Sequence, residues 1–209
     1  MNFECLFCKK DRFALNKHLN LPAEQSIIYE DKNIYVTPDL FPLVKGHFLI
    51  ITKEHYCCYG QAPKEIIDSV KIAYHFIENS IFKDHINILS FEHGTAFEEI
   101  GGSSINHAHL HVLPIKFDMI PYIKNSEYIN TEPQTISFEK LGKLYETKTP
   151  YLFVKNSIEN SIVFEVKNQI PSQFLRMIIG NALKVPYDWK CEQNIDHYKQ
   201  LFLKTIDYQ

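Results

Sequence analysis

The residues best suited to chemistry are three alternating histidines, His107, His109 and His111. Alternate side chains of a β-strand share a face, so the three imidazoles would line one face of a sheet. The intervening Ala108 and Leu110 would then pack on the other face. A row of imidazoles on a solvated sheet surface adds nothing to folding. It is typical of a strand that binds a metal, handles a phosphate or moves protons.

Two chemistries are consistent with this row. Neutral imidazole nitrogens at alternate positions of a strand can bind zinc. Alternatively, one imidazole can be a nucleophile while its neighbours orient it and hold the leaving group. A run of partly buried structural histidines is a third interpretation. The strict alternation, which ends in Val112-Leu113-Pro114, argues against that third interpretation.

A second candidate group is the pair Cys5-x-x-Cys8, two of five cysteines in the chain. The N-terminus lacks the basic and apolar regions of a signal peptide, so we expect a cytoplasmic protein. In a reducing compartment the pair indicates metal binding or redox chemistry rather than a structural disulfide. Two buried thiols that pack as small hydrophobes are the alternative.

Composition bounds the remaining classes of function. The 209 residues suffice for one good-sized domain or two small ones. A net charge of −3 and the lack of a basic run argue against a nucleic-acid footprint. No apolar stretch of the sequence is long enough to span a bilayer, so we expect no membrane association.

The pattern of apolar residues predicts the elements that position these groups. We expect a helix over 63–82, which begins at Pro63, a loop over 94–106, and strands over 26–30, 33–37, 46–52, 87–91 and the histidine row. Beyond residue 118 we expect an irregular stretch over 120–133, strands over 151–155 and 161–166, and helices over 171–183 and 195–206. The fold class is therefore α+β. We divide the chain into an N-terminal unit, 1–117, and a smaller α+β C-terminal extension, 118–209.

Taken together, these motifs resemble the histidine-triad (HIT) superfamily of nucleotide hydrolases and transferases. The matching stretches are 107–113, which fit the triad signature, and the segments Asp39–Pro42, Gly46–His55, Phe91–Gly94 and Ser104 in the family's order. The resemblance covers most of residues 5–115 and implies a five-stranded antiparallel sheet with one long helix. The extension resembles only the extensions of some bacterial members.

The resemblance also implies roles for individual residues. His109 would attack the α-phosphorus of a nucleotide conjugate and form a nucleotidyl-histidine. His111 would hold a phosphate oxygen and help to protonate the leaving group. Ser104 would stabilise charge on the phosphate, and Asp39 would accept hydrogen bonds from the ribose. A turn at the end of a strand is the alternative explanation for Asp39.

The same resemblance implies a metal site. Some relatives bind zinc through a cysteine pair, the histidine of a Lys-x-His segment and the first triad histidine. Those positions are filled here by Cys5, Cys8, His55 and His107. Two thiolates and two imidazoles would complete a closed, structural zinc site beside the nucleophile.

Two features depart from the family pattern. Glu92 stands where relatives carry an amide that donates to a phosphate, and a carboxylate cannot donate unless it is protonated. Either Glu92 or His93 could therefore face the phosphate, and a leaving group less anionic than a polyphosphate is favoured. In the extension, Gln173 and Arg176 lie one helical turn apart and could complete the leaving-group pocket. A solvated helix face is the alternative for that pair.

We therefore expect a hydrolase that releases a nucleoside monophosphate from a dinucleoside polyphosphate or a phosphoramidate. Transfer to a sugar phosphate is less favoured, because the chain is short for that activity. A nucleotidyltransferase or phosphorylase of the same superfamily is the first alternative. A catalytically silent, zinc-stabilised nucleotide-binding module and a metalloenzyme with one open site formed by the three histidines are the others. Because relatives often pair, the resemblance also allows a homodimer.

Overall fold

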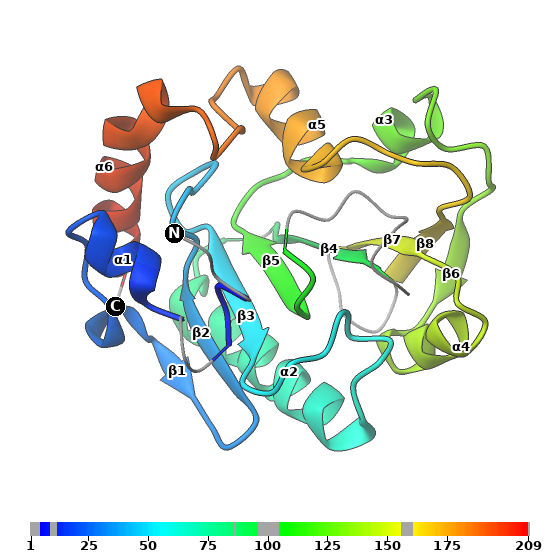
Figure 1. The fold of residues 1–209 in the computed structure, drawn as a ribbon, viewed down its shortest axis with the longest axis horizontal. Coiled ribbons are helices and arrows are strands. Elements are labelled where there is room, and N and C mark those ends of the chain that lie inside the picture. The colour runs from blue at the N-terminus through cyan, green and yellow to red at the C-terminus, as the bar shows by residue number, and fades with distance from the viewer. Residues whose placement is uncertain (1–4, 9–11, 86, 96–104, 156–160, 209) are drawn as a thin grey trace.

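One antiparallel sheet organises the molecule. The computed structural model describes residues 5–8, 12–85, 87–95, 105–155 and 161–208. Eight strands pair in the order β1-β2-β3-β5-β4-β7-β8-β6 (Figure 1). Their bounds are Tyr29–Glu30 (β1), Ile34–Pro38 (β2), Phe48–Thr52 (β3), Leu89–Gly94 (β4), His109–Leu113 (β5), Gln134–Ile136 (β6), Tyr151–Lys155 (β7) and Ser161–Glu165 (β8). The predicted five-stranded antiparallel sheet is confirmed, and the strands of the predicted extension continue it beyond β4.

The long predicted helix is also confirmed. It comprises α2 (Lys64–Phe76) and a π-helical turn, η2 (Ile77–Ile81), and Pro63 stands before its first turn with an extended backbone. Its apolar stripe packs on the sheet in the larger core. The other helices are α1 (Ala14–His18), α3 (Ile120–Lys124), α4 (Leu141–Glu146), α5 (Phe174–Leu183) and α6 (Ile195–Ile206), with 3-10 turns at Glu24–Ser26, Phe138–Lys140 and Glu192–Asn194.

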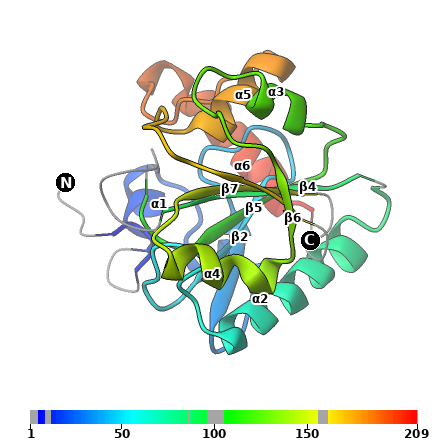
Figure 2. The same cartoon turned by 90° about the vertical axis from the view of Figure 1, so that its right-hand side faces the viewer.

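Helices cover both faces of the sheet. In Figure 2, α2 and α4 lie on one side of the strands, and α3 and α5 lie on the other. Residues Leu110 and Val112 of β5 belong to the core beneath α2 and α4, whereas Leu113 belongs to the core beneath α3 and α5. The alternation predicted for the histidine strand is therefore correct, and His109 and His111 face the side opposite α2.

Three local expectations differ from the structure. The expected strand over 26–30 is reduced to β1, because Ser26 ends a 3-10 turn in which its Oγ donates to the carbonyl of Ala23 at 2.6 Å. The stretch 120–133, expected to be irregular, begins with α3, which buries Ile123. Strand β5 begins at His109, so His107 precedes the strand that was predicted to contain it. Much of the expected loop over 94–106 lies outside the described residues.

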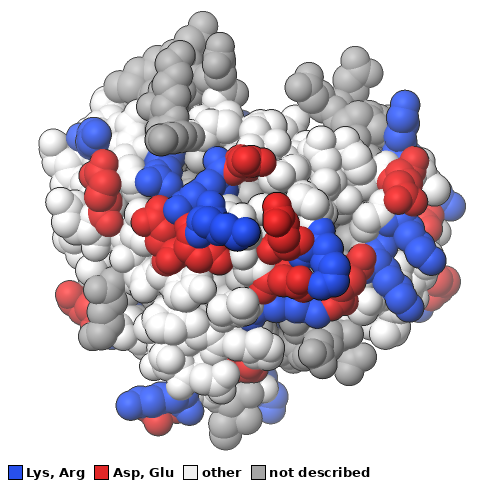
Figure 3. All heavy atoms as spheres, turned by 90° about the horizontal axis from the view of Figure 1, so that it is seen from below, with Lys and Arg blue, Asp and Glu red and all other residues white. Residues whose placement is uncertain are grey.

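The surface carries both signs of charge. On the face in Figure 3, lysine and arginine side chains lie among aspartates and glutamates. Along α2, Lys64 pairs with Asp68 at 2.5 Å, and Lys71 pairs with Glu139 of the 3-10 turn Phe138–Lys140. None of the helices in the described part of the chain has the length and hydropathy that a bilayer-spanning segment needs.

Candidate active site

A pocket opens over the sheet face opposite α2. Its floor is formed by residues of four adjacent strands, namely Tyr35 and Thr37 (β2), Leu49 and Ile51 (β3), His109 and His111 (β5), and Phe91 and His93 (β4). Its walls come from distant parts of the chain and include Phe7, Phe13, Asp39, Gln173, Arg176 and Trp189. Among the predicted site residues, the structure brings together Asp39, His93, His109, His111, Gln173 and Arg176.

The ring of His109 is held in one tautomer. Its Nδ1 lies 2.5 Å from the backbone carbonyl oxygen of His107. A carbonyl only accepts hydrogen bonds, so Nδ1 carries the proton and Nε2 keeps its lone pair. Burial lowers the pKa of His109 below its usual value, which favours the neutral ring. The edge of the Phe7 ring packs against this imidazole, with centroids 5.1 Å apart. His109 is thus a neutral, fixed imidazole with a nucleophilic nitrogen.

His111 is oriented by a histidine that directly precedes the neighbouring strand β3. The Nδ1 of His47 accepts the backbone N–H of Leu43 at 3.1 Å, so its Nε2 carries the proton. That Nε2–H donates to Nδ1 of His111 at 2.8 Å, which leaves His111 protonated at Nε2. Burial lowers the pKa of His47 to about 3, and Phe91 stacks on the His111 ring at 4.4 Å. His111 therefore offers a hydrogen-bond donor.

Sequence reasoning gave His47 no role. The residue belongs to the matched segment Gly46–His55, but no partner was assigned to it. The usable signal was its position next to the apolar run 48–51, where a polar side chain needs a buried partner. In the structure His47 is fully buried, and it also lies 3.5 Å from the Asp39 carboxylate.

Asp39 forms a buried ion pair with the extension. The guanidinium of Arg176 donates from Nη1 to Asp39 Oδ2 and from Nη2 to the Phe41 carbonyl, both at 2.6 Å. Its Nε donates to the Tyr187 carbonyl at 3.3 Å. Burial alone would raise the pKa of Asp39, but Arg176 and then His47 outweigh burial and hold that pKa below its usual value. Arg176 therefore anchors α5 to the end of β2.

Gln173 supports the same corner of the pocket from the start of α5. Its amide nitrogen donates to the Asp188 carboxylate at 3.0 Å, and its amide oxygen accepts the backbone N–H of Trp189 at 3.4 Å. Gln173 and Arg176 both line the pocket, but Gln173 precedes α5 with a left-handed backbone (φ 63°), so the pair does not share one helical face as the spacing predicted. The alternative of a solvated helix face is wrong for Arg176, which is only 7% exposed.

Glu92 and His93 point to opposite faces of β4. The strand extends to Gly94, past its predicted end at Phe91, so both residues lie within it and alternate. His93 lines the pocket, where its buried Nε2 finds no hydrogen-bond partner among the described residues. Burial lowers the pKa of His93 to about 3, so the ring is neutral.

Glu92 is directed into the core beneath α2. Its carboxylate accepts the backbone N–H of Tyr59 at 2.8 Å and the hydroxyl of Tyr151 at 2.7 Å. Burial, followed by the nearby Cys58, raises the pKa of Glu92 well above its usual value. The structure therefore does not bring Glu92 into the pocket, and its supposed repulsion of a polyphosphate does not arise. Ser104 lies outside the described residues, and its role stays a prediction.

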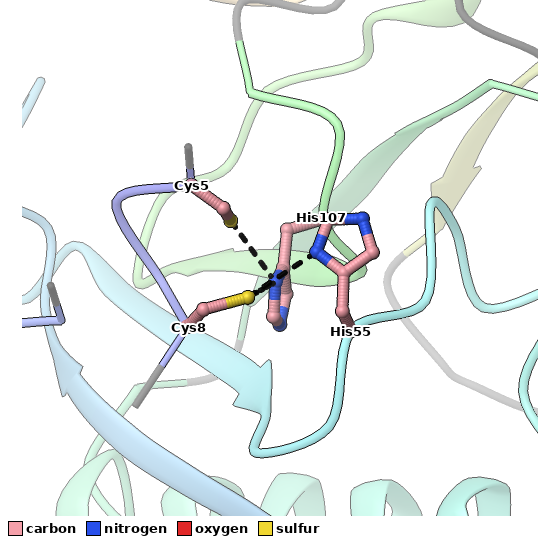
Figure 4. A group of neighbouring side chains, drawn as sticks. All are labelled: Cys5, Cys8, His55 and His107. Carbon is pink, nitrogen blue, oxygen red and sulfur yellow. Dashed lines mark hydrogen bonds between the residues drawn. The ribbon is translucent and has the colours of Figure 1, made fainter. Parts of the chain in front are cut away.

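Two cysteines and two histidines converge beside the pocket (Figure 4). Sγ of Cys5 lies 3.3 Å from Nδ1 of His107, and Sγ of Cys8 lies 3.3 Å from Nδ1 of His55. All four candidate ligand atoms lie within 4.8 Å of one another, so the group could hold a metal ion. Nε2 of His107 donates to the Thr52 carbonyl at 2.8 Å, which leaves the lone pair of Nδ1 toward the cysteines.

The three alternating histidines consequently serve two different places. His107 is turned toward the cysteines, whereas His109 and His111 line the pocket. The three rings therefore do not converge to form a single open metal site.

Comparisons with known proteins identify the family of this chain. The HIT domain family matches residues 20–118. An uncharacterized HIT-like protein of Rickettsia prowazekii is 31% identical over 123 residues, which cover 58% of this chain and 100% of that protein. One from Methanocaldococcus jannaschii is 30% identical over 114 residues, 53% of this chain and 78% of that protein. The solved structure of a yeast Ap4A phosphorylase is similar with a TM-score of 0.48 and 15% identity, and covers 93% of this chain and 78% of that one.

Proposed function

The chain belongs to the HIT family, and from that premise we propose that it hydrolyses a nucleotide conjugate through a nucleotidyl-histidine. The substrate class is a dinucleoside polyphosphate or a nucleoside phosphoramidate, and the product is a nucleoside monophosphate. The observation that carries the proposal is the tautomer of His109. Its Nδ1–H is bound to the His107 carbonyl, so Nε2 presents a lone pair to the pocket.

In the first step, Nε2 of His109 attacks the α-phosphorus. A nitrogen–phosphorus bond forms, and the bond between phosphorus and the leaving group breaks. The leaving group departs with the bonding electron pair, either as a phosphate anion or as an amine that takes one proton from the solvent. The Nδ1–H bond to the His107 carbonyl stabilises the positive charge that develops on the ring. In the second step, water attacks the phosphorus and releases one proton to the solvent, the nitrogen–phosphorus bond breaks with its electron pair on Nε2, and His109 is restored.

His111 acts in this scheme as a hydrogen-bond donor to a phosphate oxygen. Its Nδ1 is occupied by the N–H of His47, so the ring has one proton, on Nε2. Burial, then His109 and His47, lowers the pKa of His111 well below its usual value. A neutral ring of this kind stabilises phosphate charge better than it protonates a leaving group. His93, whose Nε2 lacks a described partner, is the residue on β4 that would contact the phosphate or leaving group.

The Asp39–Arg176 pair borders the same phosphate site. Asp39 Oδ2 lies 3.7 Å from Nδ1 of His111 and is bound by Arg176. The carboxylate keeps further lone pairs with which it can accept ribose hydroxyls. Arg176, held between Asp39 and Phe41, adds positive charge near the attacked phosphate.

The cysteine and histidine cluster would hold a structural zinc. A tetrahedral zinc with sulfur and nitrogen ligands separates its ligand atoms by roughly 3.3–3.8 Å. Cys8 Sγ lies 3.3 Å from His55 Nδ1 and 3.7 Å from His107 Nδ1, which agrees with that spacing. When bound, the metal would tie the N-terminal segment to the sheet. Its four protein ligands would leave no open position for substrate.

The proposal is tested by His109→Ala. We expect turnover of diadenosine and diguanosine polyphosphates and of matched phosphoramidates to fall by at least 10³-fold, because the nucleophile is lost. Binding of the monophosphate product should remain, since the rest of the pocket is unchanged. Full activity in the variant would refute the mechanism. A covalent mass adduct of one nucleoside monophosphate on the wild-type chain, absent in the variant, would support it.

Hydrolysis and phosphorolysis are separated by the product. With inorganic phosphate in the assay, hydrolysis still gives the nucleoside monophosphate, whereas a phosphorylase gives the diphosphate. We expect the monophosphate. Formation of the diphosphate would replace hydrolysis by transfer of the nucleotidyl group from His109 to inorganic phosphate, and would keep His109 as the nucleophile.

A further inference from the structure

The pocket continues away from the histidines as an apolar slot. In the sheet register, His109 of β5 lies opposite Ile51 of β3, and Ile51 lies opposite Tyr35 of β2. Two strand spacings separate the Cα atoms of His109 and Tyr35 by about 10 Å. Tyr35, Leu49 and Ile51 form one buried cluster with Phe7 above it. The floor of the slot is thus apolar and extends over two strand spacings, roughly 10 Å, from the nucleophile.

Arg12 closes the far end of this slot. Its guanidinium carbon lies 4.8 Å from the centre of the Tyr35 ring and 5.0 Å from that of Phe13. These cation–π contacts with two rings, whose planes are 62° apart, hold the guanidinium beside the slot. Arg12 lines the pocket, and its side chain is 21% exposed.

The N–H donors of Arg12 are largely unused. Its acidic neighbour Glu30 is 3.7 Å away, and Glu30 is held more closely by Lys53, at 2.8 Å. Within the described ranges no hydrogen bond occupies the guanidinium. The other charged residues of the described pocket lining, Asp39 and Arg176, lie toward His111. Among the described residues, Arg12 is therefore a fork of donors at the end of an apolar slot, with a long ion pair to Glu30 and no hydrogen bond.

We propose that Arg12 reads the edge of the nucleobase and gives the pocket a preference for guanine over adenine. Guanine presents O6 and N7 as adjacent acceptors, which match two parallel N–H groups of an arginine. Adenine presents N7 beside an amino group, and that amino group cannot accept a hydrogen bond from the second N–H of the arginine. Apolar slots with a few placed polar groups obtain their specificity from those groups. The inference rests on the proposed function, because it names the base of the nucleotide that His109 attacks.

The test measures product binding by calorimetry, without turnover. Wild-type protein should bind GMP at least about 10-fold more tightly than AMP. The analogue 7-deaza-GMP, which lacks the N7 acceptor, should lose most of that advantage. Arg12→Met should weaken GMP to the level of AMP and change AMP by less than about twofold. Arg12→Lys should also lose the preference, since a lysine keeps the charge but not the fork.

Lys53→Met is the matched control. It removes the closer partner of the same Glu30 but does not line the pocket, so the preference for GMP should remain. Equal binding of GMP, 7-deaza-GMP and AMP to the wild type would overturn the inference without use of any variant. A guanine preference that persists in Arg12→Met would also overturn it. Neither result bears on the role of His109 as the nucleophile, which His109→Ala tests separately. Wild-type protein that binds no nucleotide would refute both the inference and the proposed function.

Discussion

At the scale of single residues, the chemistry depends on which nitrogen of each histidine is already bonded. Thr52 accepts from His107, the His107 carbonyl accepts from His109, and His47 donates to His111. Each bond leaves the opposite nitrogen directed to the cysteines or the pocket. The alternating sequence predicts the shared face of these rings. It does not predict their tautomers, because the partners of His107 and His111 come from β3 and the segment before it.

Glu92 shows what the sequence alone does not determine about a single residue. Its role depended on whether Glu92 or His93 points to the phosphate, and alternation decides that only when the strand is known to include both. Apolar periodicity ends at Phe91, so it could not reveal that β4 continues to Gly94. Pairing with β7, which places Glu92 opposite Phe153, extends the strand.

Glu92→Gln should make the protein more stable at neutral and alkaline pH. Burial raises the pKa of Glu92 in the folded chain, so the folded state favours the protonated acid. Protonated Glu92 stabilises the fold fully at pH values below its pKa in the unfolded chain. This stabilisation is lost as the pH rises through its pKa in the folded chain. Glutamine keeps the acceptor for Tyr59 and carries no charge, so it should remove this loss.

Urea unfolding between pH 5 and pH 9 measures the effect. The wild type should lose stability relative to Glu92→Gln as the pH rises. The control is Glu146→Gln, at an exposed position of α4, which should follow the wild-type curve. Parallel curves for Glu92→Gln and the wild type would show that the buried carboxyl is not linked to folding.

At the scale of elements, periodic segments were predicted best. The stripe of α2 and the alternation of β5 reflect burial on one side, and both are confirmed. Four short elements, α1, α3, α4 and β6, and the 3-10 turns were not predicted. Each has six residues or fewer, too few to show a period, and they are stabilised by packing, as when Leu141 is buried against the sheet.

The N-terminal segment is an element that the metal would hold in place. Residues 5–8 carry both cysteines and Phe7, whose ring contacts His107 and His109 with centroids 5.8 Å and 5.1 Å apart. Without a metal, two thiols and two imidazoles give this segment only weak polar contacts. Metal binding would therefore position one wall of the pocket.

Cys8→Ser should lose zinc and become less stable. We expect the wild type to carry about one zinc per chain and the variant to carry much less, because one of four ligands is missing. The melting temperature should fall by several degrees, since 1 kcal/mol corresponds to about 2–4 °C in a chain of this size. Metal analysis by mass spectrometry and thermal unfolding are the measurements. Cys191→Ser, outside the cluster, should keep both zinc and stability. Wild-type protein purified without chelator and free of zinc would contradict the expectation.

At the scale of the whole molecule, the sheet crosses the predicted boundary at residue 117. Strand β7 of the extension pairs with β4 over five residue pairs, and α5 packs on β4, β7 and β8. The division into 1–117 and 118–209 follows the change in residue pattern near residue 118 and stays a prediction about domains. Length and composition did not predict this continuity, because the pairing of β4 with β7 links residues about 60 positions apart.

The charged link between the two parts is the Arg176–Asp39 pair, which should couple strongly. Both side chains are less than 10% exposed and lie 2.6 Å apart, so removal of one leaves a buried, unpaired charge. We expect Arg176→Met and Asp39→Asn each to lower the free energy of unfolding by about 3 kcal/mol. The double variant should lose clearly less than the sum, because it buries neither charge.

Urea unfolding of the four proteins at pH 7 gives the coupling energy, and Lys124→Met is the control. Lys124 pairs with Glu132 at 2.7 Å, but both side chains are about half exposed or more, so loss of this pair should cost less than about 1 kcal/mol.

The dependence of stability on pH supplies a second test of the Arg176–Asp39 pair. The folded pKa of Asp39 lies below its usual 3.8, so the pair contributes fully above that value. The contribution disappears as the pH falls through the folded pKa, and Arg176→Met should lose less stability over that interval. Additive losses would mean that the extension is held by apolar packing alone and that Arg176 contributes to the pocket without anchoring it.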